Sequence, residues 1–385
     1  MRRLNLEGPG SVRVVIAPDS FKGSLPATAV CAAIEEGVRR ALPDADVVRV
    51  PMADGGEGTL DCILGATGGE EIGMTVAGPL RWPVRARYLL SSDGRSAVIE
   101  LASASGLPLL AGGTDALRAD TTGTGELIAD ALRRGARDVL VCIGGSASTD
   151  GGSGLLRALG VRFEAADGTE LPPGGVHLAN LERIDMSGVA EAVGETRFKI
   201  ACDVTNPLVG PEGAAAVFGP QKGATPDEVV RLDQALHRFG DVLARDFGVR
   251  VHDLPGAGAA GGTCGGMVAI LGAEPVRGCE LVAETVGLPA ALDGADLVIT
   301  GEGRLDRQSA AGKVVSQVAR LAKERGVPAV ALAGEIVHPI GELHDIGLTA
   351  ALSIADGPRT LPDMTESAAS LLAAAAEQAV RLRLA

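Results

Sequence analysis

The sequence predicts an α/β protein with two domains. Its 385 residues exceed what one hydrophobic core usually organises. Short apolar, β-branched runs alternate with segments of helical periodicity at both chain ends, and a hairpin pattern interrupts this alternation. We therefore expect a doubly wound, Rossmann- or flavodoxin-like parallel-sheet domain built from residues 1–74 and 286–385, with residues 75–285 inserted as a second α/β domain.

The N-terminal segment has the pattern of a β-α-β unit. Residues 12–17 form a short apolar run typical of a buried strand, and the polar loop PDSFKGS follows it. Val30, Ile34 and Val38 then recur at four-residue spacing, which predicts an amphipathic helix. The run at 47–50 predicts the next strand.

The inserted segment begins with a different pattern. Residues 85–90 and 96–102 are strand-like runs joined by SSDG, which predicts a hairpin. The α/β alternation then resumes with a strand at 138–143, and a long amphipathic helix over 229–243 ends near Gly248. Further elements are expected as helices at 127–132 and 155–159 and a strand at 199–204.

The C-terminal segment returns to regular α/β alternation. Strands are expected at 295–300, 329–333 and 348–354, with helices over 314–322 and after Pro362. These strands are almost continuously apolar, as in parallel sheets that are covered on both faces.

Composition and charge exclude several classes of partner. The net charge of −14 would repel a polyanion, so neither nucleic acid nor an anionic membrane is expected to bind. The six cysteines form no C-x-x-C pair and have no histidine at metal-finger spacing, which predicts free thiols in a reducing cytoplasm. The N-terminal stretch MRRLNLEGPGS has no following apolar run, so no secretion signal is expected.

Five polar, glycine-bearing loops follow predicted strands. In open parallel sheets, ligands bind beyond the carboxyl ends of the strands, so these loops are expected to converge in a cleft between the two domains. The loops are PDSFKGS (18–24), ADGGEGT (53–59), GGSASTDGGSG (144–154), DVTNPL (203–208) and TGEGRLDRQSAAGK (300–313).

The first two loops each allow a structural and a functional interpretation. Asp19, Ser20 and Lys22 precede a predicted helix N-terminus, where an anionic group is stabilised, whereas Ser24 alone would suffice as a helix cap. In the second loop, Asp54 and Glu57 can form a capping box for the next helix or contact a ligand.

Glycine patterns elsewhere are less decisive. The 144–154 loop suits close approach of the backbone to phosphate, but it is not a Walker A loop. Gly256, Gly258 and Gly261 match G-x-G-x-x-G without a surrounding β-α-β unit, so no dinucleotide site is predicted there. The histidines are scattered along the chain and are interpreted as structural or surface residues; they are His177, His237, His252, His338 and His344.

Lysines and carboxylates spread over several glycine-rich loops fit phosphoryl transfer, which needs positioning, charge neutralisation and Mg²⁺. The segments VIAPDSFKGSL, PMADGGEGT, GELI, IGGSASTDGGSG, ACDVTNPL, FGPQKGA, GAGAAGG and VITGEGRLDRQSAAGK closely resemble the glycerate kinase type I family, in order across nearly the whole chain. The resemblance implies ATP-dependent phosphorylation of D-glycerate, usually to 2-phosphoglycerate. The family often reads SATND where this chain reads SASTD.

The resemblance also implies a set of site residues. Expected catalytic residues are Lys22, Asp203 and Asp19, and expected substrate-binding residues are Ser20, Asp54, Glu57, Asn206, Gln221 and Lys222. Expected cofactor-binding residues, for ATP, are Gly144, Gly145, Ser146, Asp150, Gly301 and Lys313, and Mg²⁺ is expected at Glu302 and Asp306. For Asp203, an Asx-turn is the structural alternative. Two other functions stay open, namely a kinase of another small hydroxy acid and a non-catalytic metabolite-binding regulator. Homo-oligomerisation is also left open.

Overall fold

The computed structural model describes residues 11–110, 112–310 and 312–384, so the predicted absence of an N-terminal signal falls largely outside the described residues. The chain forms two compact units. Unit 1 contains the described residues up to Asp54, Asp61–Ala66 and the described residues from Cys279 onward. Unit 2 contains Gly55–Leu60 and Thr67–Gly278. The chain crosses between the units in the loop before α2, between Asp54 and Gly55, then within α2 (Thr59–Thr67) and at the start of α10 (Gly278–Thr285).

Unit 1 is built on a five-stranded, all-parallel sheet with the order β13-β12-β11-β1-β2. In this sheet Val15 of β1 lies opposite Val48 of β2 and Val298 of β11. The strands are β1 (Arg13–Ile16), β2 (Asp46–Arg49), β11 (Leu297–Leu305), β12 (Ala329–Ile336) and β13 (Leu348–Ser353). This is the doubly wound sheet that the sequence predicts.

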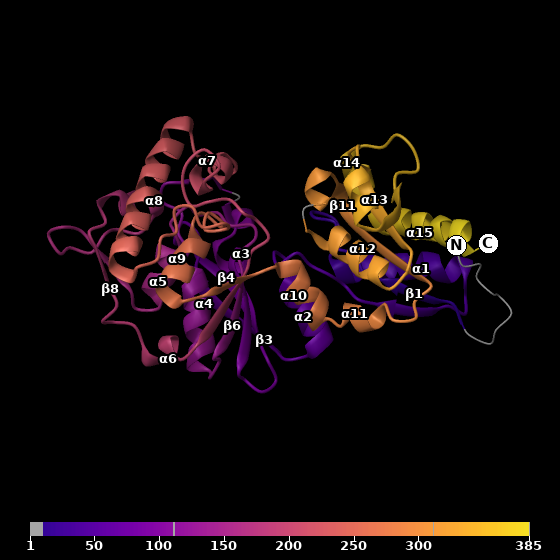
Figure 1. Cartoon of the computed structure of the whole chain (residues 1–385), viewed down its shortest axis with the longest axis horizontal. Coiled ribbons are helices and arrows are strands. Elements are labelled where there is room, and N and C mark those ends of the chain that lie inside the picture. The colour runs from indigo at the N-terminus through magenta and orange to yellow at the C-terminus, as the bar shows by residue number, and fades with distance from the viewer. Residues whose placement is uncertain (1–10, 111, 311, 385) are drawn as a thin grey trace. The chain divides into compact units, whose positions relative to one another are not determined.

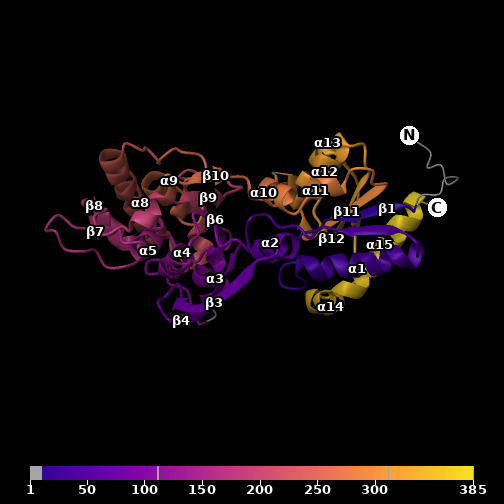
Figure 2. The same cartoon turned by 90° about the horizontal axis from the view of Figure 1, so that it is seen from below.

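Helices cover both faces of this sheet (Figures 1 and 2), and a hydrophobic core lies on each face. Because side chains alternate along a strand, Val14 and Ile16 pack on one face with α1 and α15, whereas Val15 packs on the other face with α12. Gly37 of α1 allows close packing on α15, since a Cβ there would lie 2.1 Å from the Ala373 carbonyl oxygen. The helices of unit 1 are α1 (Ala27–Ala41), α11 (Leu288–Ala291), α12 (Val314–Glu324), α13 (Gly341–Ile346), α14 (Leu361–Glu366) and α15 (Ala368–Leu384).

Two local predictions in unit 1 are wrong. Helix α1 begins after Pro26 without a side-chain cap, and the Ser24 hydroxyl instead donates to the Thr365 carbonyl at 3.1 Å. Strand β11 continues to Leu305 rather than ending at residue 300, because β12 pairs with it along this whole length. Glu302 therefore lies on a strand and not in a loop.

Unit 2 is built on a six-stranded mixed sheet with the order β10-β9-β6-β5-β4-β3. Neighbouring strands from β3 to β5 pair antiparallel, and those from β5 to β10 pair parallel. The predicted hairpin is confirmed as β4 and β5, whereas no strand was predicted for the residues that form β3. The strands are β3 (Glu70–Ala77), β4 (Pro83–Leu90), β5 (Ser96–Glu100), β6 (Asp138–Cys142), β9 (Arg197–Ala201) and β10 (Glu274–Val276).

One hydrophobic core joins this sheet to the helices of unit 2. The longest helix, α8, begins with a capping box in which the Thr225 side chain bonds the Glu228 N–H, and it ends at Gly248 in the left-handed conformation, as predicted. The helices of unit 2 are α3 (Leu101–Ser105), α4 (Thr122–Arg133), α5 (Ser153–Ala158), α6 (Glu191–Gly194), α7 (Ala214–Phe218), α8 (Pro226–Phe247) and α9 (Thr263–Leu271).

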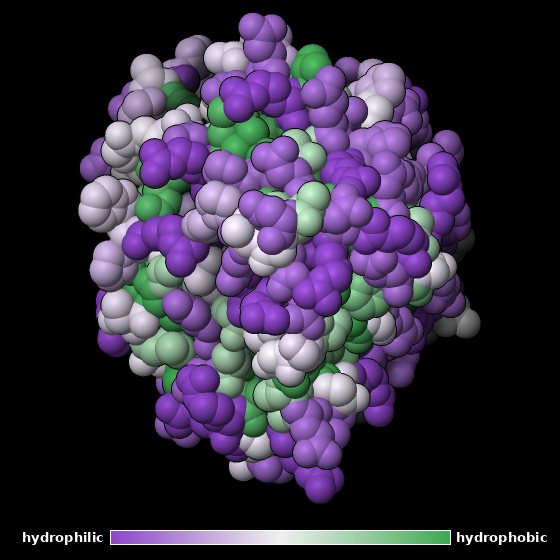
Figure 3. All heavy atoms as spheres, turned by 90° about the vertical axis from the view of Figure 1, so that its left-hand side faces the viewer, coloured by the Kyte–Doolittle hydropathy of each residue, from purple (hydrophilic) through white to green (hydrophobic). Residues whose placement is uncertain are grey.

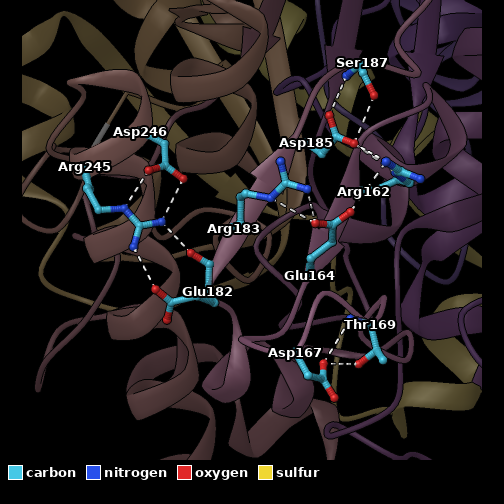
Figure 4. Close-up of polar contacts among 10 residues, drawn as sticks. All are labelled: Arg162, Glu164, Asp167, Thr169, Glu182, Arg183, Asp185, Ser187, Arg245 and Asp246. Atoms are coloured by element: carbon cyan, nitrogen blue, oxygen red, sulfur yellow. Dashed lines mark hydrogen bonds and ion pairs between the residues drawn. The ribbon is translucent and has the colours of Figure 1, made fainter.

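Ion pairs join a small hairpin, β7 (Arg162–Glu164) and β8 (Arg183–Asp185), to the C-terminal part of α8 (Figure 4). Arg183 Nε lies 3.0 Å from Glu164 Oε2 across the hairpin. Arg245 of α8 places Nη1 3.3 Å from Glu182 Oε1. The Arg245–Glu182 pair is half-exposed and by itself contributes little stability, whereas Glu164 is buried.

The face of unit 2 seen in Figure 3 is mainly hydrophilic, with separate small apolar patches. Within the described part of the chain, every helix is too short or too polar to span a bilayer. All six cysteines are free thiols.

Candidate active site

The polar loop after β1 is held against the neighbouring strand by its backbone. The N–H groups of Ala17 and Asp19 donate to the carbonyls of Ile299 and Gly301, each at 2.8 Å. These bonds continue the parallel pairing of β1 and β11 beyond the end of β1. Asp19 is thereby placed at the carboxyl end of the sheet, where ligands bind in open α/β folds.

Asp19 is a buried carboxylate with other charges around it. It is only 6% exposed, and its Oδ1 accepts a hydrogen bond from the Ser20 N–H at 2.6 Å. Burial and then the negative charge of Asp54 raise the pKa of Asp19 to about 7, although the Ser20 N–H and the Lys22 charge act in the opposite direction. This carboxyl group can therefore gain or lose a proton near neutral pH.

Lys22 extends towards solvent from the same loop. Its side chain is 67% exposed, and its Nζ lies 4.0 Å from Asp54 Oδ2. Because a contact of this length between exposed groups is weak, the ammonium group can still interact with an incoming anion.

The second half of β11 brings further charged groups to this end of the sheet. Burial raises the pKa of Glu302, and its Oε1 atom is buried without a hydrogen-bond partner among the described residues. The Asp306 N–H donates to Ser309 Oγ at 3.1 Å. Lys313 immediately precedes α12. At Gly301 a Cβ would lie 2.2 Å from the Leu332 carbonyl oxygen, so the approach of β12 by itself requires this glycine.

These side chains line one cavity of unit 1, with a volume of about 690 Å³. It brings together seven of the predicted site residues, which are Asp19, Ser20, Lys22, Asp54, Glu302, Asp306 and Lys313. Its wall therefore combines carboxylate oxygens, which suit Mg²⁺, with lysines, which suit phosphate or carboxylate groups.

Glycine-rich loops in unit 2 pack backbone against backbone. A Cβ on Gly144 would lie 2.8 Å from the Cα of Gly56 in the 53–59 loop. Gly145 adopts a φ of +74°, and its carbonyl accepts the Leu107 N–H at 3.0 Å. Ser146 is buried. Contacts within the protein therefore explain both glycines, and the predicted cofactor role of these three residues stays a prediction.

Asp150, a residue of the same 144–154 loop, has its side chain inside the protein. It has no exposed surface, and its Oδ2 accepts from the Thr121 N–H at 3.0 Å, the Thr121 hydroxyl at 2.8 Å and the Gly154 N–H at 3.0 Å. Burial raises the pKa of Asp150, and the negative charge of Asp120 acts in the same direction. Any role in cofactor binding would have to act through the shape of the loop that Asp150 holds.

Lys222 is also buried, with 1% of its surface exposed. Its Nζ donates to the Ser148 carbonyl of the 144–154 loop. Burial lowers the pKa of Lys222 to about 7, although the charge of Asp150 opposes this shift. The Lys222 side chain therefore supports the 144–154 loop. Its neighbour Gln221, the other predicted residue of this segment, is exposed.

The 203–208 loop carries two further predicted residues. Asp203 Oδ1 accepts the Gly278 N–H at 2.9 Å, and Asn206 Nδ2 donates to the Glu212 carbonyl at 2.8 Å. Both side chains are partly exposed. They can meet a ligand while keeping these bonds.

Of the two interpretations of Asp54 and Glu57, the capping box is excluded by the start of helix α2. Helix α2 begins at Thr59, too far along the chain for Asp54 to cap it. The carboxylate that bonds its first turn belongs to Glu100, whose Oε1 accepts the Leu60 N–H at 2.9 Å. Glu57 is exposed.

A second cavity, of about 810 Å³, lies in unit 2 and is lined by none of the predicted site residues. Three arginines face it, from the turn after β3, from α4 and from α5; they are Arg81, Arg133 and Arg157. The predicted residues of unit 2 thus do not gather in this cavity.

Comparison with known proteins decides the family. A sequence model of the Glycerate kinase family matches residues 14–384. The chain belongs to the glycerate kinase family. The resemblance predicted from the sequence is therefore confirmed, as is the prediction of an enzyme of the kinase class.

Relatives in the glycerate kinase family match almost end to end. A glycerate 2-kinase of Escherichia coli (strain K12) is 45% identical over 353 residues, covering 91% of this chain and 93% of that protein. A glycerate kinase of Bacillus subtilis (strain 168) is 45% identical over 362 residues, covering 94% and 95%. The crystal structure of a candidate glycerate kinase 2 from Salmonella typhimurium LT2 superposes with a TM-score of 0.85 at 45% identity, over 97% of this chain and 98% of that one. The predicted fold class is thereby confirmed.

Three charged residues of the glycerate kinase cavity were missed by the sequence reading. Arg304 lies within a quoted motif, and its Nε sits 3.7 Å from Asp306 Oδ2 and 3.4 Å from Glu335 Oε2. Glu335 lies on β12, and Arg359 lies between β13 and α14. Glu335 and Arg359 are not part of a glycine-rich loop. Only the pairing of β12 with β11 and the position of the C-terminal segment show that these two residues line the cavity.

Proposed function

We propose that this member of the glycerate kinase family transfers the γ-phosphoryl group of ATP to D-glycerate and forms 2-phosphoglycerate. The observation that carries the proposal is the unit 1 cavity, in which carboxylates and lysines from β1, β11 and their loops surround one volume of about 690 Å³. The matching relative named glycerate 2-kinase supports the 2-position as the acceptor.

The residues of the cavity divide into two chemical groups. Lys22 and Lys313 supply positive charge for the phosphates or for the carboxylate of the acceptor. Asp19 is the candidate acceptor of the hydroxyl proton, because it lies at the carboxyl end of β1 on the wall of this cavity. Ser20 and Asp54, which line the same wall, are proposed to position the small substrate.

Mg²⁺ fits the donor set of this cavity. Glu302 presents a buried carboxylate oxygen without a hydrogen-bond partner among the described residues, and Asp306 adds a second carboxylate. Both are hard oxygen ligands of the kind that Mg²⁺ prefers. When bound, Mg²⁺ would neutralise charge on the nucleotide phosphates.

The predicted residues of unit 2 complete the proposal. Asp203 and Asn206 are proposed to contact the substrate through their partly exposed side chains. Lys222 is proposed to act from inside, by holding the 144–154 loop in shape. A cleft between the two domains stays a prediction, and so does the cytoplasmic location, which the free cysteines suit.

An ADP-release assay with ATP and Mg²⁺ tests this function. D-glycerate, L-glycerate, glycolate and hydroxypyruvate serve as parallel acceptors, and enolase added afterwards converts 2-phosphoglycerate but not 3-phosphoglycerate. ADP formation with D-glycerate followed by the enolase signal supports the proposal. ADP formation with another acid alone would favour the second kinase hypothesis, and saturable binding of D-glycerate without any ADP formation would favour the regulator.

A further inference from the structure

Two of the histidines that are scattered along the chain, His237 and His252, lie close together in the structure at α8. His237 and Asp241 are one helical turn apart on this helix, and His252 follows shortly after the helix ends. The imidazole rings of His237 and His252 have centroids 4.9 Å apart. Each of the three side chains offers one ligand atom, and these atoms all lie within 4.8 Å of one another.

The distances within this cluster suit a tetrahedral metal ion. His237 Nδ1 lies 3.3 Å from Asp241 Oδ2, and His252 Nε2 is hydrogen-bonded at 3.1 Å with the other oxygen of the same carboxylate, Oδ1. Ligands at zinc bond lengths of about 2.0–2.1 Å are about 3.3 Å from one another around a tetrahedral ion. The ligand atoms, now up to 4.8 Å apart, would reach this spacing by rotation of the exposed His237 and Asp241 side chains towards His252.

The protein holds His252 in place whether or not an ion is present. The residue is 3% exposed, and a Cβ on Gly240 would lie only 2.9 Å from its Cε1 and Nε2 atoms. The glycine on α8 thus leaves the space that the imidazole occupies. By contrast, His237 and Asp241 are exposed, so an ion and a water molecule can reach the cluster from solvent.

We propose that His237, Asp241 and His252 form a binding site for a divalent transition-metal ion of the Zn²⁺ type, with water as the fourth ligand. Two imidazoles and one carboxylate are a common zinc ligand set, and the carboxylate offsets part of the charge. The same set suits Mg²⁺ poorly, because Mg²⁺ requires oxygen ligands. The site is therefore chemically distinct from the carboxylate cavity of unit 1.

Binding at this site would connect α8 to the 203–208 loop. The His252 carbonyl accepts the Leu208 N–H at 3.1 Å, and the Asn206 carbonyl accepts the Gly258 N–H at 3.0 Å. An ion that joins His252 to His237 and Asp241 therefore restrains the segment on which this loop rests. We expect the ion to raise the thermal stability of the full chain.

Equilibrium dialysis of the full chain, without a histidine tag, against Zn²⁺ tests the site. We expect one Zn²⁺ per chain, retained in excess Mg²⁺, and visible absorption bands typical of tetrahedral coordination when Co²⁺ replaces Zn²⁺. Loss of a ligand should weaken binding at least about 100-fold, since even loss of a group that only orients a ligand weakens binding about 10–100-fold. The primary variants are His237→Ala and Asp241→Asn, because both residues are exposed and their replacement should leave the fold intact.

Two variants control for binding elsewhere. His177→Ala removes another partly exposed histidine, and Cys202→Ser removes a partly exposed thiol that could itself bind Zn²⁺. Neither should alter the affinity or the rise in Tm. The proposal is overturned if no Zn²⁺ binds, if His237→Ala binds like the unchanged chain, if Mg²⁺ displaces the ion, or if Cys202→Ser abolishes binding.

Discussion

Replacing the buried carboxylate Asp19 by asparagine should stabilise the protein while it removes activity. In the metal-free, nucleotide-free state, burial and the charge of Asp54 raise the pKa of Asp19 from 3.8 to about 7. Above pH 7 the folded protein therefore contains the ionised Asp19 carboxylate, whose free energy is much lower in the solvated, unfolded chain. Asp19→Asn has nearly the same shape but cannot ionise.

The magnitude follows from linkage between protonation and folding. Each pKa unit corresponds to about 1.4 kcal/mol, so the difference between 3.8 and about 7 corresponds to about 4 kcal/mol of destabilisation at pH 8. Because the folded pKa lies above the unfolded one, this loss is absent below about pH 4 and grows until about pH 7. The buried amide has its own desolvation cost, so we expect a net gain of about 2 kcal/mol at pH 8, or roughly 4–8 °C in Tm for a unit of this size.

Calorimetry in the presence of a chelator measures this effect at pH 8 and pH 5. At pH 5 the proton already occupies Asp19 in the folded state, so the advantage of the variant should shrink by about 3 kcal/mol and vanish or reverse. Asp44→Asn, at an exposed carboxylate, is the matched control and should change stability little at either pH. An Asp19→Asn variant that is no more stable at pH 8, or equally favoured at both pH values, would refute the reasoning.

Three further predictions concern turnover. Lys22→Ala should lower kcat about 10²–10³-fold with an unchanged Tm, because its exposed ammonium group acts electrostatically; near-normal turnover would make it an ordinary surface lysine. Asp203→Asn should keep its Tm, since an amide oxygen can still accept the Gly278 N–H, and should lose most turnover; a fully active variant would leave Asp203 only the Asx-turn role. A chelator should abolish turnover and Mg²⁺ or Mn²⁺ alone should restore it, whereas undiminished turnover in chelator would remove the metal from the mechanism.

Much of the fold could be predicted because parallel strands buried on both faces leave almost continuous apolar runs. All five strands of unit 1 lie within or beside such runs. Strand β3 was missed because it lies at the edge of its sheet and buries only two of its residues, so its apolar residues alternate with charged, polar and glycine residues and form no continuous run. The end of β11 was misplaced because its second half contains glycines and charges, and only its pairing with β12 shows that it is a strand. The chain crosses between the units in the 53–59 loop and at the helices α2 and α10, and at these helices no turn-rich linker marks the crossing.

The charged part of the site could be predicted for a related reason. Polar residues directly after apolar strands stand out in a sequence, and the topology of a parallel sheet brings them to one edge. Burial, by contrast, is not visible in a motif. Asp150 and Lys222 lie in glycine-bearing polar motifs like that of Asp19, yet both are inside the protein, where Asp150 accepts the Thr121 N–H and Lys222 donates to the Ser148 carbonyl.

The glycines of the 144–154 loop show how contacts within the protein can account for a motif that also suits phosphate binding. Seen as a sequence, they suggest a backbone that approaches phosphate. In the structure, a Cβ on Gly151 would lie 2.6 Å from the Phe239 ring, and one on Gly154 would lie 2.6 Å from the Thr122 nitrogen. A loop packed so tightly against α8 and α4 is pre-organised before any ligand arrives, and pre-organisation is what electrostatic catalysis requires of groups that stabilise charge.

Gly151→Ala should therefore lower both the Tm and the activity. If Gly151 served only to let the backbone contact phosphate, the same substitution would lower the activity and leave the Tm unchanged.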